Sequence, residues 1–147
     1  MGIPIVGDSS ELASLRKRGV KYAALGVGAV TNPQLRKQLY ERLDNHGFEL
    51  PSFIHPNSSV EASVQMGAGN QIFACAVVST LVTLGDNTLI NSGCVISHDC
   101  QIGSHSHITP GAILAGGVMV GENSTIGMGC TVFFGTIIGT NAVIGNN

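Results

Sequence analysis

An aliphatic residue recurs at every sixth position over the last two thirds of the chain. All sixteen positions of this register hold Ile, Val, Leu or Met, and the register never slips. An α-helix cannot keep a six-residue frame over this length, whereas short strands joined by corners can. The repeat therefore predicts a coiled β-structure with an aliphatic core. The sixteen residues are Ile54, Val60, Met66, Ile72, Val78, Leu84, Ile90, Ile96, Ile102, Ile108, Leu114, Val120, Ile126, Val132, Ile138 and Ile144.

A longer period of 18 residues lies inside the first. Glycine directly follows the aliphatic residue in every third hexapeptide, so three hexapeptides make one coil. Two residues further on, the chain has only residue types that tolerate a positive φ, and we expect a left-handed corner there. The repeat thus predicts a three-sided parallel β-helix of about five coils, stacked at the ~4.8 Å strand spacing. The corner column is Gly69, Asn87, His105, Asn123 and Asn141.

The first 53 residues follow another pattern. Short apolar runs at residues 3–7, 21–28 and 50–56 alternate with helical segments, one over residues 9–19 and one opened by Asn32 and Pro33. This βαβαβ order predicts a small parallel sheet. We therefore divide the chain into a partial α/β domain over residues 1–53 and a β-helix over residues 54–147.

Charge and cysteine content exclude several classes of protein. The formal net charge is −2, and no Lys or Arg occurs after residue 42, so we expect no nucleic-acid partner. The most apolar run, residues 72–84, is too short to span a bilayer, and we expect no membrane association. Cys94, Cys100 and Cys130 occupy a column of small inward-facing residues, where a buried apolar role is expected, and Cys75 lies at a corner. Free thiols and the absence of a targeting segment predict a cytoplasmic protein.

Three of the five histidines fall in the stretch CVISHDCQIGSHSHITPGAILAGG, residues 94–117. This stretch, inside the hexapeptide repeat and after a small α/β unit, resembles the hexapeptide-repeat acyltransferases, and among them the sialic-acid O-acetyltransferase and UDP-amino-sugar N-acetyltransferase family. The resemblance implies a left-handed coil and an acetyl-CoA-dependent acetyltransferase acting on a sugar or nucleotide sugar. It also implies a homotrimer with sites between subunits. Compared with that family, the chain lacks the first strand and glycine-rich loop and the C-terminal tail.

The resemblance also implies roles for individual residues. His98 corresponds to the family's general base. An imidazole suits this role because it can take up a proton near neutral pH. Asp99 corresponds to the acidic residue that orients this base. Four residues correspond to acetyl-CoA contacts and one, at the end of KYAALG, to a contact with the sugar substrate. The acetyl-CoA contacts are His107, Gly116, Met128 and Asn146, and the sugar contact is Gly26.

Other interpretations of these residues remain open. Asp99 stands at a corner position where later coils have Gly117 and Gly135, so turn chemistry alone explains an Asp there. A zinc site like that of hexapeptide-repeat carbonic anhydrases needs further histidines near His98, but residues 93 and 103 are glycine, and we expect no metal. The main alternative to an acetyltransferase is a catalytically inactive trimeric β-solenoid.

Overall fold

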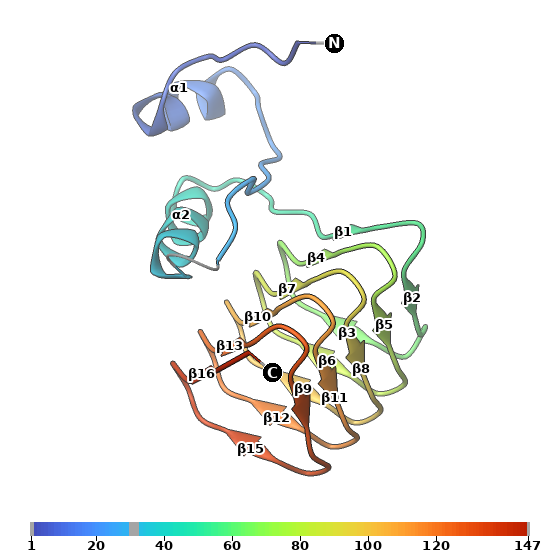
Figure 1. The fold of residues 1–147 in the computed structure, drawn as a ribbon. Coiled ribbons are helices and arrows are strands. Elements are labelled where there is room, and N and C mark those ends of the chain that lie inside the picture. Colours follow the sequence, from blue (N-terminus) through green and yellow to red (C-terminus); the bar gives the residue numbers. More distant parts are fainter. Residues whose placement is uncertain (1, 30–32, 147) are drawn as a thin grey trace.

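The computed structural model describes residues 2–29 and 33–146, and most of them form a three-sided solenoid of parallel sheets (Figure 1). The first sheet contains β1 (Phe53–Ile54), β4 (Gln71–Ile72), β7 (Leu89–Ile90), β10 (His107–Ile108), β13 (Thr125–Ile126) and β16 (Val143–Ile144). The second contains β2 (Ser59–Val60), β5 (Val77–Val78), β8 (Val95–Ile96), β11 (Ile113–Leu114) and β14 (Thr131–Val132). The third contains β3 (Gln65–Met66), β6 (Thr83–Leu84), β9 (Gln101–Ile102), β12 (Met119–Val120) and β15 (Ile137–Ile138).

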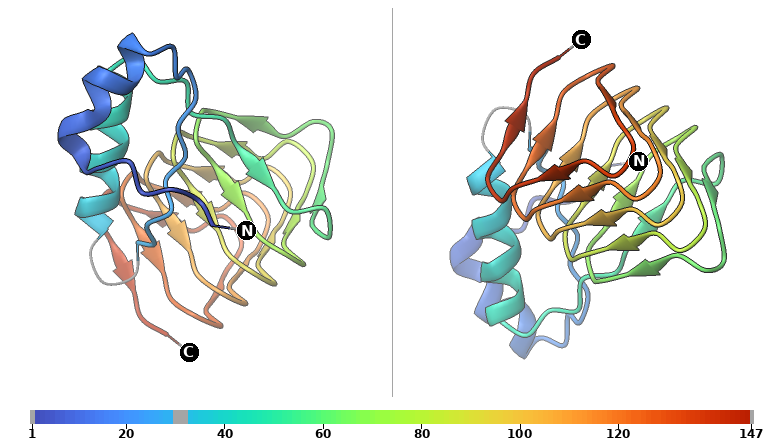
Figure 2. Two further views of the ribbon diagram at one scale, coloured as in Figure 1. Left: turned by 90° about the horizontal axis from the view of Figure 1, so that it is seen from above. Right: turned by 90° about the horizontal axis from the view of Figure 1, so that it is seen from below.

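Strand pairing follows the predicted 18-residue period without exception. Phe53 pairs with Gln71 at the start of the stack, and Thr125 pairs with Val143 at its end, in parallel register. The second residue of each strand points inward, because successive side chains of a strand alternate between its two faces. These aliphatic residues are buried from Ile72 to Ile138. The views from above and below show three-sided coils stacked one on another (Figure 2). The prediction of a parallel β-solenoid is confirmed.

From Gly69 onward, each corner of the prism turns at a residue with positive φ. The predicted column is confirmed, with φ between 55° and 68° at Gly69, Asn87, His105, Asn123 and Asn141, between the third sheet and the first. The other two corners use the same geometry. The second corner, between the first and second sheets, has Cys75, Gly93, Gly111 and Gly129. The third corner, between the second and third sheets, has Leu81, Asp99, Gly117 and Gly135.

The N-terminal segment contains the two predicted helices but not the predicted sheet. A 3₁₀ turn, η1 (Ser9–Glu11), leads into α1 (Leu12–Lys17), and α2 (Pro33–Asn45) follows, while the expected helix start at Asn32 lies outside the described residues. The strand predicted at residues 3–7 is wrong: Ile3 and Ile5 are exposed, and no described segment pairs with them. A strand needs a neighbour to satisfy its backbone groups. The run at residues 21–28 forms a single parallel bridge, Tyr22 with Glu49.

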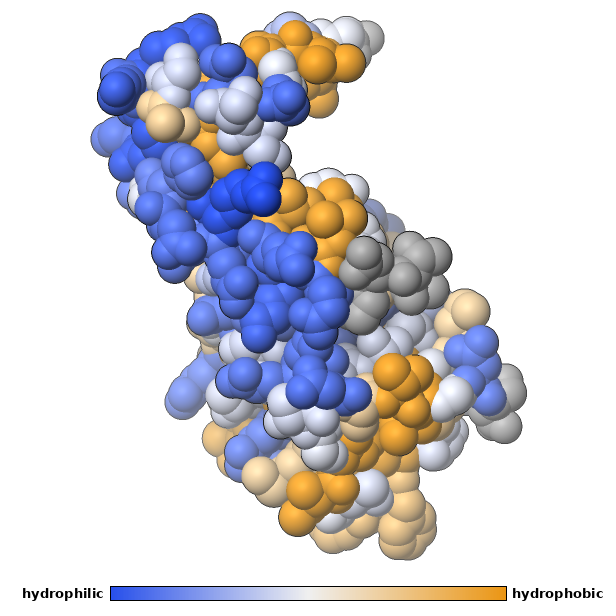
Figure 3. Space-filling view, turned by 90° about the vertical axis from the view of Figure 1, so that its left-hand side faces the viewer, coloured by the Kyte–Doolittle hydropathy of each residue, from blue (hydrophilic) through white to orange (hydrophobic). Residues whose placement is uncertain are grey.

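Helix α2 packs on the corner between the third and first sheets. The Tyr40 ring lies so close to Gly69 that a Cβ there would come within 2.8 Å of it. The Gln71 side-chain amide donates a hydrogen bond to the carbonyl of Leu25 at 2.7 Å, which ties the strand-like run to β4. The surface over the helices is mostly hydrophilic, whereas apolar surface gathers over the last coils (Figure 3). The N-terminal unit thus lies over part of the first sheet, beside β4, β7 and β10.

Candidate active site

His98 and Asp99 form a hydrogen-bonded pair at the third corner, between β8 and β9. The distance from His98 Nδ1 to Asp99 Oδ2 is 2.7 Å. Asp99 has a φ of 60°, so the backbone turn itself brings its carboxylate beside the preceding ring. If Nδ1 donates to this carboxylate, Nε2 is left as the proton acceptor. The His98 and Asp99 side chains are 54% and 56% exposed, so Nε2 can meet a substrate from outside.

Gly116 lies against the His98 ring from the next coil. The nearest atoms around the place of a Cβ on Gly116 are Cε1, Nε2 and Nδ1 of His98. The Gly117 N–H donates to the His98 carbonyl at 2.9 Å, which stacks the two coils. The structure therefore brings Gly116, predicted as an acetyl-CoA contact, together with the predicted base.

His107 is buried in β10 and is held by Asn91. Asn91 Oδ1 accepts a hydrogen bond from the Ser92 N–H at 2.8 Å, so its Nδ2 faces His107 Nε2 at 3.1 Å. His107 Nε2 is then the acceptor and Nδ1 carries the proton, without a partner of its own. Burial, with a smaller effect of the charge on Arg36, lowers the pKa of His107 to about 4. The ring is neutral at physiological pH.

Gly26 and His107 line the same cavity, between the N-terminal unit and the first sheet. Its volume is about 330 Å³, and its wall also includes Val27, Gly28, Gln71, Phe73, Leu89 and Asn91. Arg36 is only 2% exposed and donates to the Val27 carbonyl at 2.6 Å, and burial lowers its pKa to about 10. The predicted sugar contact and one predicted acetyl-CoA contact thus share one cavity.

Met128 and Asn146 meet at the second corner. The Met128 N–H donates to Asn146 Oδ1 at 2.9 Å, across one coil. The predicted site residues therefore form three groups in one chain: His98, Asp99 and Gly116 at the third corner, Gly26 and His107 on the first sheet, and Met128 with Asn146 at the second corner. The structure does not bring these groups together within a single subunit.

The buried cysteines are poor nucleophiles in this fold. Burial raises the pKa of the Cys94 thiol to about 11, and it raises that of Cys100 as well. The Cys100 thiol donates to the carbonyl of Ala115 at 3.2 Å inside the prism. Both thiols therefore serve packing, as the sequence predicts. Within residues 2–29 and 33–146, no group of three or more His, Cys, Asp or Glu side chains is arranged to hold a metal ion.

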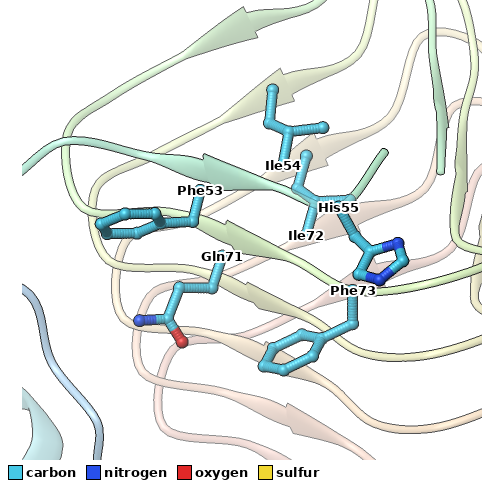
Figure 4. Close-up of a pocket in the computed structure, with 6 residues that line it drawn as sticks. All are labelled: Phe53, Ile54, His55, Gln71, Ile72 and Phe73. Atoms are coloured by element: carbon cyan, nitrogen blue, oxygen red, sulfur yellow. The ribbon is translucent and has the colours of Figure 1, made fainter. Parts of the chain in front are cut away.

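Another cavity lies at the start of the solenoid. It has a volume of about 220 Å³ and is lined by Phe53, Ile54, His55, Gln71, Ile72 and Phe73. Figure 4 shows Phe53 and Gln71 projecting from the same face of β1 and β4. Its wall is almost entirely apolar, and none of the predicted site residues reaches it.

No helix among the described residues has the length and apolar character that a membrane span requires.

The sequence did not point to Asn91 or Arg36. Asn91 lines the cavity beside His107, and Arg36 donates a hydrogen bond to the carbonyl of Val27 in the cavity wall. Asn91 precedes His107 by 16 residues, two short of a full coil, so the 18-residue register could have placed them on adjacent strands. Arg36 gives no such signal, because its position depends on how α2 docks on the first sheet.

The comparisons with known proteins identify the family. Residues 82–116 match a model described as bacterial transferase hexapeptide (six repeats), and residues 117–147 match one described as hexapeptide repeat of succinyl-transferase. PerB from Caulobacter crescentus, solved with CoA and GDP-perosamine, is 36% identical over 99% of this chain and 69% of its own, with a TM-score of 0.93. The chain belongs to the hexapeptide-repeat acyltransferases.

A second acyltransferase structure agrees with this assignment. The acetyltransferase domain of PglB from Neisseria gonorrhoeae, solved with acetyl coenzyme A, is 34% identical over 99% of this chain and 69% of its own, with a TM-score of 0.90. A histidine-to-asparagine variant of the Caulobacter enzyme, described as a perosamine N-acetyltransferase, was solved with the same two ligands. No sequence among curated proteins matches the chain. The family and the enzyme class predicted from the hexapeptide repeat and the histidine stretch are confirmed.

Proposed function

We propose that this acyltransferase moves the acetyl group of acetyl-CoA to the amino group of a nucleotide-linked amino sugar. Two similar enzymes support the donor, since they were solved with CoA or acetyl coenzyme A. The Caulobacter enzyme supports the acceptor, because it is an N-acetyltransferase solved with GDP-perosamine. The observation that carries the proposal for this chain is the 2.7 Å contact between His98 and Asp99 at an open corner.

The pair suits the removal of a proton from an amine. Asp99 accepts from Nδ1 and holds the His98 ring in the tautomer whose Nε2 keeps a free lone pair. As the amine nitrogen attacks the thioester carbonyl carbon, Nε2 takes the proton that the nitrogen must lose. The C–S bond then breaks, and the proton passes to the departing sulfur. The products are an N-acetyl sugar and CoA with a free thiol, so His98 returns to its starting state.

The complete site is formed between two subunits of a homotrimer. In one chain His98 stands at the corner between the second and third sheets, whereas the Gly26 and His107 cavity opens on the first sheet. Packing the third corner of one subunit against the first sheet of its neighbour would bring the base to that cavity. The resemblance to the trimeric acetyltransferases supports this arrangement, in which Met128 and Asn146 extend the groove for acetyl-CoA.

Replacing His98 tests the chemistry. His98→Ala should lower kcat by about 10²- to 10⁴-fold, the usual contribution of a general base. His46→Ala is the matched control, because His46 is an exposed histidine just after α2 whose ring contacts the Arg42 carbonyl, far in the fold from the third corner. CoA release from acetyl-CoA is measured with GDP- and UDP-linked amino sugars. Equal rates for His98→Ala and wild type would leave the inactive solenoid as the better interpretation.

Mixing subunits tests the site between chains. His98→Ala and His107→Asn should each be nearly inactive as pure proteins. Coexpressed, they should recover roughly a quarter of the wild-type rate, because an interface regains both halves only when the two variants are neighbours in the right order. The two proteins purified separately and mixed without unfolding are the control. Absence of recovery in verified mixed trimers would place both halves in one subunit and overturn this arrangement.

A further inference from the structure

We propose that Gly116 is a positioning residue, which sets the place of the His98 ring by having no side chain. This inference rests on the proposed function, since it concerns the base that the reaction uses. Gly116 belongs to the coil after His98, on the same corner of the prism. Its effect on the ring can be measured without any assay of activity.

The backbone does not require glycine at this position. Thr80, His98, Gly116 and Phe134 occupy the same place in four successive coils, and three of them carry side chains. The residue that turns the corner here is the next one, Gly117, with a φ of 68°. The φ of Gly116 lies outside the left-handed region, so any L-residue can adopt this backbone conformation. Something other than the turn therefore accounts for the glycine.

The room left by Gly116 is filled by the His98 ring. A Cβ on Gly116 would lie 2.6 Å from Cε1, 2.7 Å from Nε2 and 3.2 Å from Nδ1 of His98. Carbon atoms do not pack at such distances, since the optimum between carbons is about 3.5–4.0 Å. The two closest ring atoms include Nε2, the proposed proton acceptor. Any side chain at residue 116 would thus exclude the ring from the place where Asp99 holds it.

The ring, and not the fold, would yield to an added methyl group. The His98 side chain is half exposed and can rotate outward, and the three nearest atoms to the added Cβ all belong to this ring. A displacement of Nε2 by about 1 Å is enough to cost up to 10²-fold in rate. Gly116→Ala should therefore lower kcat roughly 10- to 100-fold. The KM for acetyl-CoA should stay within about twofold, because the variant keeps its backbone N–H.

Two other glycines provide matched controls. A Cβ on Gly139 would meet nothing within 4 Å, so Gly139→Ala should keep the wild-type kcat and stability. Gly117→Ala should instead lower the thermal midpoint, because its φ of 68° strains an L-residue. Gly116→Ala should match wild type in thermal midpoint and oligomeric state. A loss of stability comparable to that of Gly117→Ala would mean that Gly116 serves the backbone and would overturn the proposal.

A double variant and a spectrum complete the test. In the His98→Ala background, Gly116→Ala should cause no further loss of rate, because the ring it displaces is already gone. In ¹⁵N-histidine NMR of the trimer, the Nδ1–H resonance of His98, assigned through His98→Ala, should shift in Gly116→Ala and stay unchanged in Gly139→Ala. An unshifted resonance, or an equal loss of rate in both backgrounds, would overturn the inference. Full activity of His98→Ala would instead refute the proposed function, and the NMR comparison would still decide the position of the ring.

Discussion

The Tyr40 ring of α2 meets the His105 ring of the solenoid edge to face, with centroids 5.4 Å apart and an interplanar angle of 73°. His105 Nδ1 is 3.0 Å from Nδ2 of Asn87, one coil earlier in the same corner column. A residue whose positive φ turns the corner thus also provides the surface on which the N-terminal unit docks. The same N-terminal unit supplies Gly26, Val27 and Gly28 to the wall of the cavity that also contains His107.

Tyr40→Ala should therefore loosen the N-terminal unit. Removing a buried aromatic ring costs about 3 kcal/mol in the free energy of unfolding. Tyr40→Phe keeps the ring and should stay close to wild type. Urea unfolding with limited proteolysis at residues 2–29 measures both effects. Wild-type protection in Tyr40→Ala would show that this contact does not hold the unit in place.

Replacing Asp99 separates catalysis from turn chemistry. Asn tolerates the φ of 60° at this corner as Asp does, so Asp99→Asn should keep the fold. The variant loses the negative charge beside His98 Nδ1, and kcat should fall about 10²-fold, the lower end of the range for acid–base groups. Steady-state kinetics at saturating acetyl-CoA test this. An Asp99→Asn enzyme with wild-type kcat would leave Asp99 with a role in the turn alone.

Acid should destabilise the protein through His107. The pKa of His107 is about 4 in the folded chain, below its ordinary 6.5, because burial disfavours the charged ring. A depressed histidine pKa contributes stability that is fully present above pH 6.5 and is lost as the pH falls toward 4. Lowering the pH from 7.5 to 5 should therefore remove about 2 kcal/mol from the free energy of unfolding.

Urea unfolding of wild type and His107→Asn at the two pH values isolates this contribution. The variant should start less stable at pH 7.5 and lose about 2 kcal/mol less than wild type on acidification. Burial also lowers the pKa of His105, so this residue contributes the same loss of stability on acidification in both proteins. An identical loss in the two proteins would mean that His107 is protonated in the folded chain at pH 5.

Leu81 is the strained position of the third corner. Its φ is 57°, a conformation that disfavours L-residues by about 1–2 kcal/mol, and its side chain is exposed. Leu81→Asn should therefore raise the free energy of unfolding by about 0.5–1 kcal/mol, because Asn tolerates this conformation. Calorimetry shows the change as a higher thermal midpoint. Leu81→Ala keeps the strained φ and is the control, so its thermal midpoint should not rise above that of the wild type.

The six-residue register predicts the solenoid in detail because its interactions are local and repeat along the sequence. The shared phase of Ile54, Val60 and Met66 places the strands and their inward faces, and the glycine in every third hexapeptide places each partner 18 residues away. The same register places Gly116 one coil after His98. The strand prediction at residues 3–7 was wrong because this run lies outside the repeat. Whether an isolated apolar run becomes a strand depends on a neighbouring segment that the run itself does not specify.

The sequence by itself determined the coil, its core, its corners and the histidine stretch, since each follows from the period and from residue types that tolerate a given φ. Only the tertiary structure decided how α2 buries Arg36 beside His107, which side chain meets the His98 ring, and that the predicted site residues lie in three separate places. The burial of Arg36 and the separation of the site residues depend on how whole units dock. The contact with the His98 ring depends on side-chain packing between coils. The repeat pattern of the sequence encodes neither the docking nor this packing.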